Sequence, residues 1–274
     1  MDLPDKYIIV GDLMKITVSG IETAFDGEDW ILIDKSGDFS LDKTVMATIW
    51  LVGGGMDGTD GFTDNRGFHH GGIGGQGGNV YKFGKIKLKK GDKYSVIIGN
   101  ANEPSGTSFK FGQILFNSGQ MGHTYTFGGA GGIINSNGAV VAPVFGKDGV
   151  ETPYGYVGSS GGGGVCTAVI DGITRATGMS RGGAGAGNSR RYLVNGMNWD
   201  DFKDNSPNID AVNFGCGGGG NTYCVGLNDI GVKSHGMQGC IIIQYEVIED
   251  EDNAPDCSIR YWDKPKSTNE SGGT

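Results

Sequence analysis

GGIGGQGG, from Gly71 to Gly78, is one of several glycine runs in a region that extends from Gly53 to Gly220. Runs of four glycines follow at Gly161 to Gly164 and at Gly217 to Gly220. Glycine loses more backbone entropy on folding than any other residue, so such runs stay disordered unless their backbone is packed. The runs lack the repetitive, serine-rich composition of a linker and are interrupted by apolar residues. We therefore interpret them as an ordered surface of packed backbone. The alternative is a flexible, low-complexity region.

Close approach of backbones is the physical reason to build with glycine. Without a Cβ atom, an extended or polyproline II-like chain can lie against another backbone and make Cα–H···O contacts. Each contact is weak, but many together hold loops rigid and leave other side chains to project at the breaks. We therefore predict an all-β, sandwich-like domain with extensive glycine-rich loops, partly of the polyglycine II type, gathered at one end.

Strand patterns accompany the glycine runs. The main candidates are MKITV at Met14 to Val18, Trp30 to Ile33, Val45 to Val52, Tyr81 to Leu88, the run from Tyr94 to Ile98, Val140 to Phe145, Val165 to Ile170, Tyr192 to Val194 and Gly239 to Val247. The run from Val45 to Val52 is apolar on both faces, which indicates a strand buried on both sides. The turn KKGD predicts that the strands before and after it pair as a hairpin, and VIDGIT at Val169 to Thr174 predicts another. We expect Gly239 to Val247 to be a central strand.

Composition and charge exclude several function classes. The chain has 274 residues, a net charge of −9 and a pI near 4.9, which argues against binding to nucleic acid or to an anionic membrane surface. No run of eighteen apolar residues occurs, and the first ten residues lack the layout of a signal peptide. We therefore expect a protein made in a cytoplasm, without membrane insertion.

The five cysteines form no CxxC pair, and any disulfide scheme leaves one of them over. We predict free, partly buried thiols. A bridge between Cys216 and Cys224, which flank GGGGNTY, is the alternative.

No catalytic or metal-binding constellation stands out, so we predict neither an enzyme nor a cofactor nor a metal site. The histidines lack metal-binding spacing, and the adjacent His69 and His70 point to opposite sides of an extended chain. The glycine runs lack the helix and the Gly-Lys-Ser/Thr ending of phosphate loops. The residues Asp57, Asp60 and Asp64 have the wrong spacing for a calcium loop. Paired carboxylates of a glycoside hydrolase remain an alternative among Asp200, Asp201, Asp204 and Asp210.

A binding site needs fewer specific residues than a catalytic site does. Aromatic residues flanked by Asn, Ser and Gly supply flat apolar area and adaptable hydrogen bonds, which suit sugar or protein surfaces. The alternative is that about half of these aromatic residues pack under the glycine loops as a local core. The candidate binding residues are Phe62, Phe68, Tyr125, Phe127, Tyr154, Tyr156, Trp199, Phe202 and Tyr223.

Four stretches in a fixed order carry a resemblance to a known family. They are ATIWLVGGG (Ala47 to Gly55), KIKLKKGDKYSVIIGN (Lys85 to Asn100), GTSFKFGQILFNSG (Gly106 to Gly119) and QGCIIIQYE (Gln238 to Glu246). Together they resemble the glycine-rich domain of bacteriophage tail fibres and tail adhesins, over about Asp38 to Val247. The middle from Ile133 to Val212 departs from the family pattern by containing more residues other than glycine.

The resemblance implies a virion protein of the tail fibre, tail tip or baseplate that binds a glycan or protein receptor on the host surface. It implies other virion tail proteins as partners, a homo-oligomer with a trimer favoured, and synthesis in the host bacterial cytoplasm. We divide the chain into an attachment module (residues 1–37), a glycine-rich β domain (38–247) and an acidic tail (248–274). The alternatives are a purely structural collar, baseplate or capsid-decorating subunit, and a tail-associated polysaccharide hydrolase.

Overall fold

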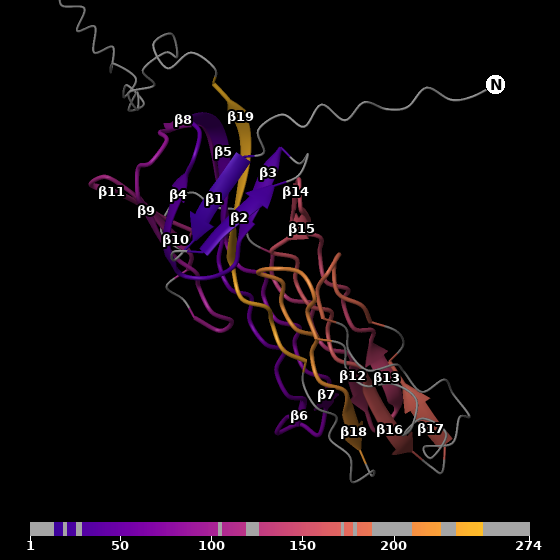
Figure 1. Ribbon diagram of the computed structural model, residues 1–274. Coiled ribbons are helices and arrows are strands. Elements are labelled where there is room, and N and C mark those ends of the chain that lie inside the picture. Colours follow the sequence, from indigo (N-terminus) through magenta and orange to yellow (C-terminus); the bar gives the residue numbers. More distant parts are fainter. Residues whose placement is uncertain are drawn as a thin grey trace, which may run out of the picture.

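The computed structural model describes residues 14–18, 21–25, 29–103, 106–118, 126–170, 173–177, 180–187, 210–225 and 234–248. Within these ranges the chain forms nineteen β-strands and no helix, which confirms the predicted all-β class. None of the described residues belongs to a helix that could span a membrane. The molecule is elongated, with a head of larger sheets, a body of extended glycine-rich segments and a tip of short strands (Figure 1).

Two sheets form the head. The six-stranded sheet has the order β11-β10-β9-β4-β1-β2, and the four-stranded sheet has the order β3-β19-β5-β8. The strands of the first are β1 (Met14–Val18), β2 (Ile21–Phe25), β4 (Gly37–Leu41), β9 (Tyr94–Ile97), β10 (Ser108–Phe111) and β11 (Ile114–Asn117). Those of the second are β3 (Trp30–Ile33), β5 (Val45–Val52), β8 (Val80–Leu88) and β19 (Cys240–Val247). All pairs within both sheets are antiparallel.

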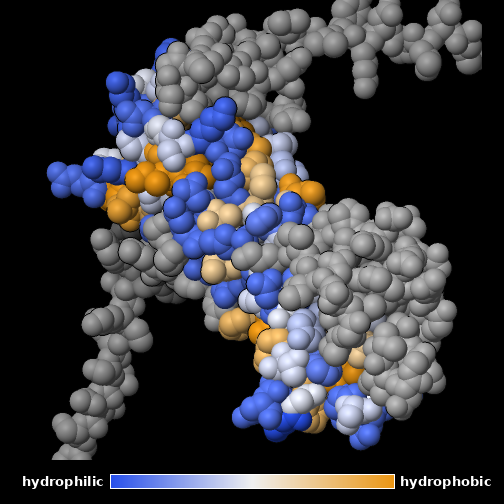
Figure 2. Space-filling model, turned by 90° about the horizontal axis from the view of Figure 1, so that it is seen from below, coloured by the Kyte–Doolittle hydropathy of each residue, from blue (hydrophilic) through white to orange (hydrophobic). Residues whose placement is uncertain are grey.

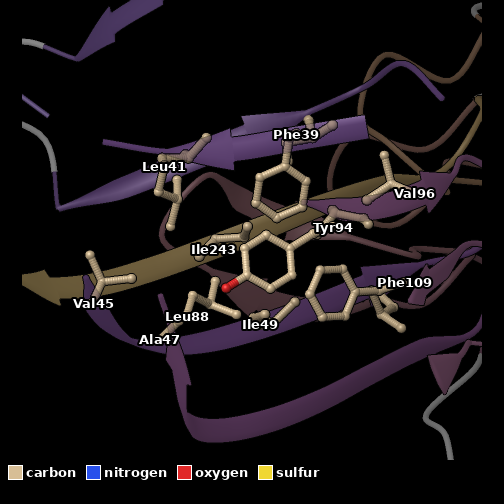
Figure 3. Close-up of a cluster of buried hydrophobic side chains, with 14 of the residues drawn as sticks. Phe39, Leu41, Val45, Ala47, Ile49, Leu88, Tyr94, Val96, Phe109 and Ile243 are labelled. Carbon is tan, nitrogen blue, oxygen red and sulfur yellow. The ribbon is translucent and has the colours of Figure 1, made fainter. Parts of the chain in front are cut away.

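Both sheets contribute to one hydrophobic core (Figure 3). The six-stranded sheet supplies the rings of Phe39, Tyr94 and Phe109, whose centroids lie 5.1 to 5.9 Å apart. The four-stranded sheet supplies aliphatic side chains, among them Ile49 and Ile243, which are fully buried. Aromatic pairs at such distances add to the stabilisation from buried apolar area.

Strand β5 is buried on both faces, as its sequence predicts. Ile49 and Leu51 lie in the core shared by the two sheets, whereas Trp50 and Val52 belong to a second cluster on the opposite face. Its partner β19 pairs with β5 on one side and with β3 on the other, so the expectation of a central strand is confirmed. The second cluster connects the four-stranded sheet to Val157 and other residues of the body.

The predicted hairpin across KKGD is wrong. Strand β8 pairs with β5, whereas β9 pairs with β4 and β10 in the other sheet. The turn therefore passes the chain from one sheet to the other, so that Leu88 and Tyr94 both enter the shared core. Strand β2 is not among the strand candidates from the sequence, and it pairs with β1.

The amino-terminal strands are integrated into the head sheets. Strand β1 pairs with β4, and β3 pairs with β19. The role of residues 1–37 in attachment stays a prediction. Residues 1–13 and 249–274, and the predicted strand from Tyr192 to Val194, lie outside the described residues.

Extended glycine-rich segments form the body, which we call the glycine bundle. They are residues 53–59, 71–79, 126–132, 144–147, 158–165, 181–187, 214–222 and 234–239. Their backbone hydrogen bonds recur with a period of three residues. In segment 71–79, the N–H groups of Gly71, Gly74 and Gly77 donate to segment 126–132 at 2.8 to 2.9 Å. The N–H groups of Gly72, Gly75 and Gly78 donate to segment 215–221 at 2.6 to 2.8 Å.

Glycine is required in the bundle because neighbouring backbones occupy the space of a side chain. A Cβ atom added to Gly75 would lie 1.9 Å from the carbonyl oxygen of Met56, and one added to Gly128 would lie 1.6 Å from that of Gly74. Real Cβ atoms essentially never approach other heavy atoms within 3.0 Å. By contrast, a Cβ atom on Gly84, in strand β8, would meet its nearest neighbour at 3.8 Å.

Three cysteines are free and buried, as predicted: Cys166, Cys216 and Cys240. Since Cys216 is free, it forms no bridge with Cys224. Burial raises the pKa of the Cys166 thiol to about 12, and it also raises the pKa of Cys216 and of Cys240.

Candidate functional site

The tip consists of two small sheets at the end of the glycine bundle farthest from the head (Figure 1). One has the order β13-β12-β7-β6, with β6 (Phe62–Thr63), β7 (His69–His70), β12 (Ile133–Asn135) and β13 (Gly138–Val141). The other has the order β17-β16-β18, with β16 (Cys166–Ile170), β17 (Ile173–Ala176) and β18 (Tyr223–Val225). Strands β16 and β17 pair antiparallel, so the hairpin predicted from VIDGIT is confirmed. Strand β13 ends at Val141, four residues before the predicted end at Phe145.

An aromatic surface lies on the β6–β7 hairpin. The ring of Phe62 stacks on the imidazole of His70, with centroids 4.6 Å apart and an interplanar angle of 5°. Phe62 is nevertheless 53% exposed. Because one face of its ring rests on His70, the opposite face is presented to solvent. A flat exposed ring of this kind can stack on an apolar ligand surface.

Thr63 joins this hairpin to the neighbouring sheet. Its Oγ1 atom lies 2.8 Å from Nδ1 of His69 and 2.8 Å from the hydroxyl oxygen of Tyr223. The rings of His69 and Tyr223 lie 6.2 Å apart between centroids. These contacts hold together two strands that are 160 residues apart in sequence.

Asp64 organises the turn between β6 and β7. Its carboxylate accepts hydrogen bonds from the N–H groups of Arg66 and Phe68, both at 2.9 Å, and lies 3.1 Å from Nη2 of Arg66 and 3.4 Å from Nε2 of His70. Burial raises the pKa of Asp64, but these hydrogen bonds outweigh it and lower the pKa to about 2. The guanidinium of Arg66 lies 5.2 Å from the ring centroid of Phe68. The turn is thus fixed while the Arg66 side chain stays 74% exposed.

We call this group of residues the tip cluster: Phe62, Thr63, Asp64, Arg66, Phe68, His69, His70 and Tyr223. It contains three of the nine aromatic residues that the sequence proposes for binding. The other members were missed as binding residues because the sequence relates Asp64 only to a metal loop and the histidines only to a metal site. The turn sequence DNRG after β6 is the signal that could have indicated the role of Asp64, since Asp commonly bonds to N–H groups further along a turn.

The other candidate aromatic residues lie elsewhere. Phe127 is 68% exposed and follows Thr126, which pairs with Gly77 at the end of the bundle near the head. Tyr154 packs against Trp30 and Phe214, with ring centroids 6.1 and 5.5 Å apart, in the second core cluster. Tyr156 is half-buried on β15 (Gly155–Val157), which pairs with β14 (Val150–Thr152). The remaining three, Tyr125, Trp199 and Phe202, lie outside the described residues.

Asp57 and Asp60, which the sequence relates to a calcium loop, have separate partners. Asp57 accepts a hydrogen bond from the N–H group of Gly236 at 2.9 Å and lies 3.2 Å from Nδ1 of His235. Burial raises the pKa of Asp57, but its hydrogen bonds outweigh this and lower the pKa. Asp60 accepts from the side-chain amide of Asn221. In the part of the chain that the structure describes, no three His, Cys, Asp or Glu side chains come together as a metal site.

Of the carboxylates considered for glycoside hydrolysis, only Asp210 lies in a described range, where it accepts a hydrogen bond from the N–H group of His235 at 2.7 Å. Asp200, Asp201 and Asp204 lie outside these ranges.

Compared with protein-family models and with curated protein sequences, the chain gives no match.

Proposed function

We propose that this chain is a bacteriophage virion tail protein, of the tail fibre, tail tip or baseplate, that attaches the particle to the host cell surface through the tip cluster. One observation carries the proposal: Phe62, Phe68 and Tyr223 gather at one end of the molecule, beside exposed polar groups. The order of the four family-like stretches supports the tail assignment.

We further propose that the head is a β-sandwich and that the glycine bundle is of the polyglycine II type. Two sheets that share one core support the sandwich. The three-residue period of the hydrogen bonds and the close approach of the backbones support the polyglycine II geometry, since this helix has three residues per turn. Such a bundle is a stiff spacer that holds the tip away from the head.

A rigid tip favours binding because little conformational entropy is lost when a ligand is bound. The turn is held by Asp64 and the two sheets by Thr63, so the Phe62 ring and the Arg66 guanidinium are placed before a ligand arrives. The ring supplies apolar area and the guanidinium supplies hydrogen-bond donors, which together suit a glycan or a polar protein surface. Several copies on one particle would add avidity to weak single sites, and we favour a trimer.

The test is binding of fluorescently labelled protein to a panel of bacterial strains, comparing wild type with Phe62→Ala. The matched control is Phe127→Ala, because Phe127 is at least as exposed but lies at the other end of the bundle. We expect saturable binding by the wild type and the control, and a loss of at least tenfold in affinity for Phe62→Ala with an unchanged melting temperature. Equal binding by all three proteins would contradict attachment through the tip cluster.

A purely structural virion subunit is the second candidate, and exposed apolar side chains of the head favour it. Ile97, Ile114 and Leu115 of the six-stranded sheet are 62%, 40% and 58% exposed. In the view of Figure 2, hydrophobic residues gather in small patches among hydrophilic ones on the described surface. These side chains suit contacts with neighbouring virion proteins. If a multimeric form of the protein binds no strain of the panel, while it binds purified tail particles that lack it, the structural role is the correct one.

A further inference from the structure

A groove on the side of the glycine bundle forms a second site, separate from the tip cluster. It lies between residues 145–148 and residues 181–184 and has a volume of about 550 Å³. Small-molecule sites commonly have volumes of about 300–1,000 Å³. The groove is therefore large enough for a sugar unit and not only for a single ion.

Backbone hydrogen bonds fix both walls of the groove. The N–H group of Gly146 donates to the carbonyl oxygen of Arg181 at 2.8 Å, which links one wall directly to the other. The N–H group of Lys147 donates to Oγ of Ser160 at 2.9 Å. The N–H group of Ala184 donates to Oδ1 of Asp148 at 2.7 Å. The walls are thus held in place without a ligand, which lowers the entropic cost of binding.

Two cationic side chains, one aromatic ring and one carboxylate line the groove. The carboxylate is that of Asp148, which accepts the hydrogen bond from the N–H group of Ala184. Lys147 and Arg181 are exposed, and no carboxylate of the described residues forms an ion pair with either of them. The guanidinium carbon of Arg181 lies 5.4 Å from the ring centroid of Phe145, which is 45% exposed. The groove thus carries two positive charges and one negative charge, on a chain whose net charge is −9. The two cations beside the ring mark a local site for an anion.

We propose that this groove binds an anionic sugar unit, namely a pyranose that carries a carboxylate or a phosphate group. Arg181 pairs with the anionic group through two parallel N–H···O bonds, and Lys147 adds a second positive charge. The exposed part of the Phe145 ring contacts the apolar C–H face of the sugar. The proposal does not depend on the function of the tip cluster, because its residues and its place on the bundle are different.

Calorimetric titration of the full chain tests the proposal with four probes: trigalacturonate, glucose 6-phosphate, neutral maltotriose and inorganic phosphate. We expect binding of trigalacturonate, of glucose 6-phosphate or of both, and at least tenfold weaker binding of the other two probes. The two acidic probes distinguish a carboxylate from a phosphate as the recognised group. Equal affinity for maltotriose, equal affinity for inorganic phosphate, or no binding of either acidic sugar would overturn the proposal.

Variants locate the binding in the groove. We expect Arg181→Gln to lower the affinity for the acidic sugar at least tenfold and Lys147→Gln to lower it several-fold. Both variants should keep the melting temperature of the wild type, because the two side chains are exposed. The matched control is Lys82→Gln, since the ammonium group of Lys82 lies 4.8 Å from the Trp50 ring centroid in the head and is also a cation over an aromatic ring. Affinities that are unchanged in Arg181→Gln, or reduced as much by Lys82→Gln, would place the binding elsewhere and refute the assignment.

Discussion

Replacing Gly75 with alanine tests whether the glycine bundle depends on backbone contact. The new Cβ atom would lie 1.9 Å from the carbonyl oxygen of Met56 and would have to move to at least 3.0 Å, a displacement of about 1.1 Å. The N–H group of Gly75 donates to Gly218 at 2.6 Å, and its carbonyl oxygen accepts from Gly161 at 2.9 Å. A displacement of this size breaks at least two hydrogen bonds around the residue.

The expected loss of stability follows from these two hydrogen bonds. Leaving a buried polar group without its partner costs about 1–3 kcal/mol. Alanine offsets about 0.4–1 kcal/mol of this by reducing the entropy of the unfolded chain. Two such losses less this offset give an expected decrease in the free energy of unfolding of about 1–6 kcal/mol for Gly75→Ala, against the roughly 5–15 kcal/mol that is typical of folded proteins.

Urea unfolding followed by circular dichroism measures this difference. The matched control is Gly84→Ala, because the Cβ atom there meets its nearest neighbour, Oγ1 of Thr48, at 3.8 Å. The control should unfold within about 0.5 kcal/mol of the wild type or be slightly more stable, since alanine in an open strand position costs nothing in packing. If Gly75→Ala also stays within about 0.5 kcal/mol of the wild type, the bundle does not need glycine for contact, and our account of the body is wrong.

Three further outcomes are expected. The pKa of Asp64 is about 2 in the folded chain and 3.8 ordinarily, so its carboxylate stabilises the fold above about pH 4. This stabilisation is lost as the pH falls from about 4 to about 2. The difference in melting temperature between wild type and Asp64→Asn should therefore shrink over that range. Phe109→Ala, in the shared core, should lower the free energy of unfolding by about 3–5 kcal/mol in urea titrations, whereas the exposed Phe127→Ala should change it by less than about 0.5 kcal/mol. A variant with Cys224→Ala and Cys257→Ala keeps only the three buried thiols, which should react with a disulfide reagent at pH 8 only after unfolding.

The sequence predicts several of the head strands, although not β2 or β4, because the side chains of those strands carry the information. The alternation in Val45 to Val52 indicates burial on both faces, and three consecutive isoleucines indicate a central strand. Which strands pair with each other is harder to predict from the sequence, as β8 and β9 show. A short turn with apolar residues on both sides suits a hairpin within one sheet and equally a passage between two sheets. Only the shared core, which receives Leu88 from one sheet and Tyr94 from the other, decides between them.

The arrangement of the glycine bundle is set mainly by backbone hydrogen bonds and only at a few places by side chains, such as that of Thr126, which donates to the carbonyl oxygen of Gly158. Runs such as Gly161 to Gly164 and Gly217 to Gly220 are locally identical, so no pattern of apolar residues says which segment lies beside which. For the same reason, the contact between Thr63 and Tyr223 could not be predicted, because it depends on how two distant segments run through the bundle. The sequence does indicate that glycine is needed for close approach, and the neighbours of Gly75 agree with this.

The three-residue period links the bundle to the position of the tip. The N–H groups of Gly217, Gly220 and Tyr223 donate at 2.8 to 2.9 Å to Ser159, Gly162 and Val165, so the segment that ends at Tyr223 advances in steps of three along its neighbour. In a helix with three residues per turn, deleting one residue turns every later N–H group by about 120° toward a different neighbour. Deleting one glycine from this run should therefore disrupt the bundle beyond that point and separate Tyr223 from Thr63. Deleting three glycines keeps the direction of each later N–H group, so the hydrogen bonds of the bundle can form again. It also shortens the segment by one turn, about 9 Å, and so still moves Tyr223 away from Thr63. The three-residue period thus keeps the bundle in register, and the length of the segment that ends at Tyr223 places that residue beside Thr63.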